Sequence, residues 1–250
     1  MPKIKFSLLS IIGGLTLLSS SAYAGVDAEV SYILNTLLFL IGGFLVMWMA
    51  AGFAMLESGL VTSKSVATIA AKNIGLYSIA GLMFWLVGYN LAYGIPEGGF
   101  IGSFLPWSDA SAVDTGYSDG SDWFFQMVFC ATTCSIVSGT LAERIKIWPF
   151  FLFCAILAGV IYPIEMGWQW GGGHLAAAGF SDFAGSTLVH SAGAAAALAG
   201  ALLLGPRLGR FTDSGEAAPM APFASSSIPL ATLGVFILWM GWFGFNLSLI

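Results

Sequence analysis

The stretch YILNTLLFLIGGFLVMWMAAGFAMLESGLV, residues 32–61, decides the fold class of this chain. Its 30 residues include one charged side chain, Glu57. About 20 consecutive apolar residues are enough for an α-helix to cross the hydrocarbon core of a bilayer. The stretch therefore predicts a transmembrane helix.

The composition of the whole chain extends this prediction. Of its 250 residues, 58% are hydrophobic and 8% are charged, whereas roughly a quarter of the residues of a soluble domain are charged. So few charges cannot cover a water-exposed surface. The net charge of −5 argues against nucleic-acid binding through a basic face, and three cysteines are too few for a disulfide-stapled scaffold. We predict an all-α polytopic membrane protein.

Hydropathy predicts six spans, with a leader before the first. The spans cover 32–61, 65–94, 122–141, 147–163, 186–205 and 224–250. Near the start, Lys3 and Lys5 precede a short apolar run, and residues 22–24 (AYA) have the small-x-small pattern of a signal-peptidase site. We expect residues 1–24 to be a signal peptide and residues 25–250 to form one transmembrane domain. An uncleaved first helix is the alternative.

The positive charges that follow the leader predict an orientation. They lie in or beside alternate short loops, which the positive-inside rule places in the cytoplasm: Lys64, Lys72, Arg144, Lys146, Arg207 and Arg210. The loops 95–121 and 164–185 contain acids but neither lysine nor arginine. We expect a multi-pass protein of the inner (plasma) membrane, with its mature N-terminus outside and an acidic outer mouth that modestly favours cations.

Asp182, Ser186 and His190 are spaced four residues apart at the start of the fifth span. On an α-helix they share one face, so that Asp182 can cap the helix while His190 lies about 12 Å deeper in the membrane. An ionisable side chain at that depth costs about 2.5 kcal/mol or more to insert and needs a polar partner or path. His190 is therefore a candidate pore residue, with a structural histidine as the alternative, whereas capping alone accounts for Asp182.

Aromatic side chains form a second set of candidates. Phe125 and Phe129 share a helix face in the third span, and Trp168 and Trp170 precede the glycine run 171–173. Such residues usually pack in the core or anchor a helix at the membrane interface. A ring at an acidic mouth can also hold a cation by its face, which is worth about 2 kcal/mol when the cation is desolvated.

Other polar and small residues favour structural roles. Glu57 and Lys72 are placed to pair across the first two spans, and the alanine- and glycine-rich run 191–197 predicts that the fifth span packs centrally. No span combines a nucleophile with a base or a cluster of metal ligands. We expect no enzyme activity, no cofactor and no metal.

Five segments together resemble the ammonium transporter (Amt/Rh) family in order and spacing. They are DFAGSTLVH at 182–190, AGFAMLESGL at 51–60, GTLAER at 139–144, WGGG at 170–173 and GWFGFN at 241–246. The resemblance covers nearly all of residues 30–246. It implies an ammonium-transporter-like helical bundle that moves ammonium or ammonia, assembles as a homotrimer and is regulated at its inner face by a PII-type protein.

The resemblance also implies roles for individual residues. Trp170 and Phe125 resemble the aromatic wall of an outer ammonium site. Phe129 and Phe245 resemble the stacked pair that closes the pore, and His190 resembles the first of two facing pore histidines. A bare ion does not cross the hydrophobic pore beyond the pair, so ammonium is expected to lose a proton on the way.

Asp182 resembles the family's aspartate, which supports the outer site without touching ammonium.

The chain departs from the family pattern in two ways. The family's outer-site serine falls here at Leu249, with Ser248 one step away. Family members have about eleven spans in a five-plus-five inverted repeat, and this chain stops in the sixth, which predicts one five-helix half plus a sixth helix. The second pore histidine is absent, because the other histidine, His174, lies in an outer loop and is expected to be solvated.

Three other functions remain open at this point. They are an ammonium sensor, an Rh-like gas channel and an inactive truncated product.

Overall fold

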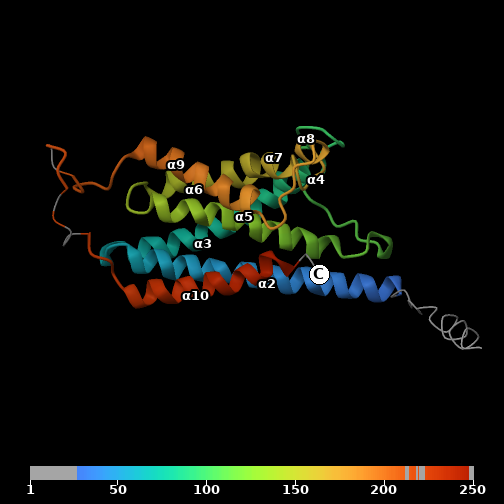
Figure 1. Ribbon diagram of the computed structural model, residues 1–250, viewed down its shortest axis with the longest axis horizontal. Helices are drawn as coiled ribbons and strands as arrows, with labels where there is room; N and C mark the ends of the chain where they lie inside the picture. Colours follow the sequence, from blue (N-terminus) through green and yellow to red (C-terminus); the bar gives the residue numbers. More distant parts are fainter. Residues whose placement is uncertain (1–26, 212–213, 218, 220–222, 248–250) are drawn as a thin grey trace, which may run out of the picture.

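The computed structural model describes residues 27–211, 214–217, 219 and 223–247. The predicted leader, Ser248 and Leu249 lie outside these residues. Within them, six helical segments are long and apolar enough to cross a membrane. They run lengthwise beside one another (Figure 1), as the sequence predicts.

The six segments are built from eight α-helices and three π-helical stretches, counted over the described residues. The bounds are α2 (Ala28–Leu60); α3 (Val66–Met83), continuing through Phe84–Gly88 into α4 (Tyr89–Tyr93); α5 (Asp119–Leu141); α6 (Ile147–Ile156), continuing through Leu157–Ile161 into α7 (Tyr162–Gly167); Ser186–Ser191, continuing into α9 (Ala192–Leu204); and α10 (Ile228–Phe245). A short helix, α8 (His174–Ala177), lies in the connection between α7 and α9.

The sixth segment begins four residues later than predicted. The side chain of Ser227 accepts a hydrogen bond from the backbone N–H of Leu230 at 3.3 Å, which satisfies one free donor of the first turn. Pro229 suits that turn because its missing N–H would have no partner there. Ser227 therefore fixes the start of α10 at Ile228.

α5 lies at the centre of the described bundle. It packs against α2, α3 and α9, and its buried face includes Cys130, Cys134 and Val137. The prediction that the fifth span is central is wrong for the described residues, because α9 buries only a narrow stripe. A β-carbon at Gly193 would lie 2.9 Å from Cβ of Ile136, so the small residues let α9 approach α5 closely along that stripe.

α2 and α10 lie side by side (Figure 1) in direct backbone contact. A β-carbon at Gly234 would lie 2.5 Å from the backbone nitrogen of Leu56, and one at Gly244 would lie 2.5 Å from the carbonyl oxygen of Gly42. Only glycine permits this approach. The contact holds the end of α10, with Phe245, against the middle of α2.

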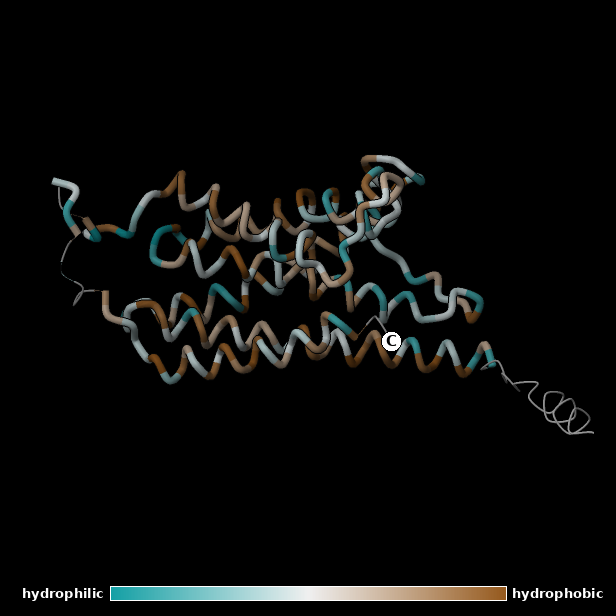
Figure 2. The backbone as a smooth tube through the Cα atoms, in the orientation of Figure 1, coloured by the Kyte–Doolittle hydropathy of each residue, from teal (hydrophilic) through white to brown (hydrophobic). Residues whose placement is uncertain are grey.

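The two ends of the bundle differ in charge, and hydrophilic residues gather there (Figure 2). The basic end, as we call it, holds the loops after α2, α5 and α9, with Lys64, Arg144, Lys146, Arg207 and Arg210. The acidic end holds the starts of α2 and α5 and the connections after α4 and α7, with Glu97, Asp109, Asp114, Asp119 and Asp182. The predicted gathering of positive charge on one side is confirmed.

The predicted pair between Glu57 and Lys72 is also confirmed. The ammonium nitrogen of Lys72 lies 3.2 Å from a carboxylate oxygen of Glu57 and donates to the carbonyl of Ser138 at 2.7 Å. The Ser138 hydroxyl donates to Glu57 at 2.9 Å. Both charges are buried, so this network joins α2, α3 and α5 inside the bundle.

Candidate functional site

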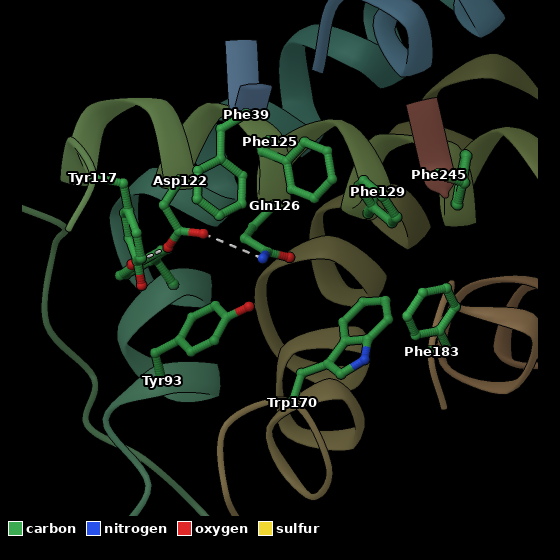
Figure 3. A pocket seen from close by; sticks show the side chains of 11 residues that line it. Phe39, Tyr93, Tyr117, Asp122, Phe125, Gln126, Phe129, Trp170, Phe183 and Phe245 are labelled. Atoms are coloured by element: carbon green, nitrogen blue, oxygen red, sulfur yellow. Dashed lines mark hydrogen bonds between the residues drawn. The ribbon is translucent and has the colours of Figure 1, made fainter. Parts of the chain in front are cut away.

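A cavity of about 330 Å³ opens at the acidic end of the bundle (Figure 3). Nine aromatic rings and two polar side chains line it: Phe39, Tyr89, Tyr93, Tyr117, Phe125, Phe129, Trp170, Phe183 and Phe245, with Asp122 and Gln126. We call it the aromatic cavity. Phe125, Phe129 and Trp170, for which the sequence predicts site roles, therefore line the same cavity as Phe245 at the end of α10.

One face of α5 supplies four of these side chains. Asp122, Phe125, Gln126 and Phe129 follow one another at i, i+3, i+4 and i+7, the spacing that places residues on one helical face. The rings of Phe125 and Phe129 have centroids 4.7 Å apart, and the two residues are 4% and 2% exposed. This face thus runs from a carboxylate down to a buried aromatic floor.

The floor is closed by the predicted pair Phe129 and Phe245. Their ring centroids lie 4.3 Å apart with planes inclined by 53°, so the rings touch but are tilted rather than stacked in parallel. Trp170 stands edge-on to Phe129 at 5.9 Å. Three rings from three different segments therefore meet at the bottom of the cavity.

Asp182 acts as the cap that the sequence predicts. Its carboxylate accepts hydrogen bonds from the four backbone N–H groups of residues 185–188 at 2.7–3.1 Å. Gly185 has φ +79°, a left-handed conformation that favours glycine. The backbone carbonyl of Asp182 accepts a hydrogen bond from Nε1 of Trp170 at 2.7 Å. Asp182 thus supports the cavity wall from behind and does not line it.

His190 lies on the other side of Phe245 from the aromatic cavity. A second hollow of about 400 Å³ is lined by His190, Ser186, Trp242 and Phe245, among others. The rings of His190 and Phe245 are 5.4 Å apart, and Nδ1 of His190 lies 3.1 Å from the Gly185 carbonyl oxygen. Phe245 therefore separates the two hollows.

The backbone around His190 is π-helical, where the sequence predicts a regular α-helix. The backbone N–H of His190 donates to Gly185, five residues back, at 2.9 Å. Asp182 precedes this helix, so the three residues spaced by four do not share a continuous α-helical face. The π-helical stretch is a local feature that side-chain periodicity does not reveal.

The sequence interpretation missed Asp122 and its partners. Asp122 is 6% exposed; the hydroxyl of Tyr89 donates to it at 2.6 Å and the amide of Gln126 at 3.3 Å. The signal was present, because Asp122 precedes Phe125 by three residues on the same helical face. Beside them, burial and then the neighbouring carboxylates raise the pKa of Tyr117 above its usual 10, so this phenol is neutral at physiological pH.

His174 is not a solvated loop residue. Its ring stacks on Phe100 at 4.2 Å and meets the edge of Trp168 at 5.0 Å. Its backbone N–H donates to Gly99 at 2.9 Å, which folds the connection after α7 back onto the connection after α4. These contacts give His174 and Trp168 a packing role outside the aromatic cavity.

Comparison with known proteins identifies relatives over most of the chain. The model of the Ammonium Transporter Family matches residues 37–249. The chain is 42% identical over 224 residues to the putative ammonium transporter sll1017 of Synechocystis, covering 88% of this chain and 49% of the relative. It is 42% identical over 222 residues to ammonium transporter Amt2 of Archaeoglobus fulgidus, covering 83% and 45%.

Solved structures agree with these matches. A structure named Sensor Amt Protein shares 35% identity and a TM-score of 0.80, covering 88% of this chain and 56% of that one. Candida albicans Mep2 shares 26% identity and a TM-score of 0.73, covering 88% and 49%. The chain spans about half the length of the curated relatives it matches. On the family match and the 42% identical relatives, this chain belongs to the ammonium transporter family.

Proposed function

We propose that the protein containing this chain moves ammonium or ammonia across a membrane and that the aromatic cavity is its outer recruitment site. In this proposal the acidic end faces outside and the basic end faces the cytoplasm of a plasma-membrane protein. Relatives named ammonium transporters support the substrate. One observation supports the proposal most directly. The floor of the aromatic cavity, formed by Phe129 and Phe245, lies between that cavity and His190.

The cavity suits a small cation. Ammonium can exchange part of its hydration shell for ring faces, and Trp170 and Phe125 present the wall on which this occurs. The cation–π contact is worth about 2 kcal/mol once the ion is desolvated. Neutral solutes gain no such attraction, so the cavity selects the charged form at entry.

The Phe129 and Phe245 pair is the gate in this proposal. Both rings are 2% exposed, and a bare ion beyond them would lose its hydration without a charged partner. We infer that ammonium transfers a proton to water in the cavity at this step, so that neutral ammonia and the relayed proton move on separately toward His190. His190 lies directly behind Phe245, with a ring-centroid distance of 5.4 Å, and is the polar ring that follows the gate on the proposed path.

Assembly and regulation follow the same proposal. Large apolar side chains are exposed on the bundle, including Leu202, Leu203 and Phe243, as expected for contact with lipid or with other subunits. We propose a homotrimer with a PII-type protein at the basic end.

Uptake of labelled methylammonium tests the proposed function. The complete product of the gene is expressed in cells that lack their own ammonium transporters, and its presence in the membrane is checked by immunoblot. We expect saturable uptake well above that of cells with the empty vector. Uptake equal to the empty-vector control, with the protein present in the membrane, would contradict the proposal. Ammonium binding without flux would instead favour a sensor.

A further inference from the structure

We propose that Asp122 is the specificity-determining charge of the aromatic cavity, a carboxylate that captures ammonium before it reaches the rings of Phe125 and Trp170. This inference rests on the proposed function and deepens it. It adds a charge to a recruitment site whose other lining side chains are uncharged, nine aromatic rings and the amide of Gln126.

Asp122 is placed above the aromatic wall and not within the gate. It is the fourth residue of α5, about 4.5 Å along the helix axis from Phe125 and about 10 Å from Phe129. Figure 3 shows it at the opposite end of the cavity from Phe245, with Gln126 and Trp170 between them. An ion entering from the acidic end therefore meets Asp122 before it reaches Phe129 and Phe245 (Figure 3).

The carboxylate of Asp122 can accept more hydrogen bonds than Tyr89 and Gln126 donate to it. It accepts from the Tyr89 hydroxyl and the Gln126 amide, whereas a carboxylate offers about four acceptor sites. The N-terminal turn of α5 also favours negative charge at this position. Asp182 differs, because four backbone N–H groups already occupy its oxygens.

No lysine or arginine is among the described residues that line the cavity. Two ion pairs of the bundle, Glu57 with Lys72 and Glu143 with Arg207, lie away from the cavity. A carboxylate without a neighbouring positive charge, surrounded by rings, attracts a small monovalent cation. A cation that carries N–H groups can also donate hydrogen bonds to the free acceptor sites of the carboxylate. Ammonium and methylammonium have this chemistry, whereas neutral ammonia lacks the charge.

A structural role is the competing explanation, since Asp122 also ties α5 to α4 through Tyr89. Two variants separate the explanations. Asp122→Asn removes the charge while keeping an oxygen acceptor for Tyr89. Tyr89→Phe removes the hydrogen bond while keeping the charge.

The experiment measures concentration-dependent methylammonium uptake by the complete gene product in proteoliposomes. We expect Asp122→Asn to raise KM about tenfold while the maximal rate stays within about twofold. Tyr89→Phe keeps the charge but removes one donor to it, so it should raise KM clearly less than Asp122→Asn does. The matched control is Asp109→Asn, which removes the same charge from an exposed loop at the same end, where Asp109 accepts hydrogen bonds from Ser111. Its KM should stay within about twofold of wild type.

Three outcomes would overturn this inference. The first is an equal KM for Asp122→Asn and Asp109→Asn. The second is an equal rise in KM for Asp122→Asn and Tyr89→Phe, which would assign the effect to the hydrogen bond. The third is a lower maximal rate with unchanged KM. Failure of the proposed function is distinct, because then the wild-type protein would show no saturable uptake.

Discussion

Trp170 donates a hydrogen bond from its indole nitrogen to the backbone carbonyl of Asp182 at 2.7 Å. This bond joins a wall of the aromatic cavity to the cap of the helix that carries His190. The aromatic cavity and His190 are therefore joined by one connected set of contacts, which runs through Asp182 and Gly185.

Replacing Asp182 by alanine should lower stability. Four backbone N–H groups would lose their acceptor, and loss of a charged cap of this kind costs about 2–4 kcal/mol. We expect a lower melting temperature in detergent, with asparagine less harmful than alanine. Asp109→Ala is the matched control, and equal melting of the Asp182→Ala and Asp109→Ala proteins would contradict this role.

Replacing Trp170 tests the ring-face contact. Trp170→Phe keeps an aromatic face but loses the hydrogen bond to Asp182, whereas Trp170→Leu loses both. We expect leucine to raise the KM for methylammonium about tenfold and phenylalanine by less. If the two variants changed KM equally, binding by the ring face would be excluded.

His190→Ala should alter transport without preventing assembly. The imidazole contacts Phe245 and the Gly185 carbonyl, so its removal changes the polarity directly behind the gate. We expect a changed maximal rate or a changed ratio of charge to methylammonium moved in proteoliposomes. Size-exclusion chromatography checks assembly. Unchanged transport would return His190 to a structural role.

The buried pair of Glu57 and Lys72 gives a stability prediction. Lys72→Met leaves a buried carboxylate without its cation, which typically costs about 3–5 kcal/mol. The double variant Glu57→Gln with Lys72→Met removes both charges and should melt at a higher temperature than Lys72→Met alone. Strictly additive losses in the melting temperature would show that the two charges are not coupled.

Glu143 at the basic end predicts a loss of stability in acid. Burial alone would raise its pKa, but hydrogen bonds from Thr62 and Ser65 and the charge of Arg207, 2.9 Å away, outweigh burial and lower the pKa below its usual 4.5. A carboxyl with a lowered native pKa contributes stability above pH 4.5 and loses it as the pH falls through the native value. The wild type should therefore lose more stability than Glu143→Gln between pH 6 and pH 3. Parallel melting curves would refute this.

Much of the fold follows from the sequence because each span is a long apolar run between polar loops. The gathering of lysine and arginine at one end follows as well, because they lie in or beside alternate loops and alternate loops meet at the same end of the bundle. The exposed position of α9 does not follow, because a run of small residues permits close packing on one side without determining how many sides are covered. The π-helical turn at His190 is hidden as well, since one extra residue per turn leaves no periodic signal.

The part of the candidate site that lies on a single helix was predictable from the sequence. Phe125 and Phe129 share a face of α5, and the cap formed by Asp182 follows from the chemistry of helix ends. Asp122 was missed although it lies on that same face, because an acid near a predicted helix start is usually read as solvated. Phe245 was predicted there only because residues 241–246 resemble the ammonium transporter family. Tyr89 reaches the cavity through the packing of α4, and nothing local in its sequence indicates that contact.

Methylammonium flux through the purified complete gene product in proteoliposomes tests the central claim most directly. We expect flux that saturates with concentration, exceeds that of protein-free vesicles, and is weakened by Trp170→Leu at low concentration. Flux that rises linearly and equals that of protein-free vesicles, with folded protein present, would contradict it.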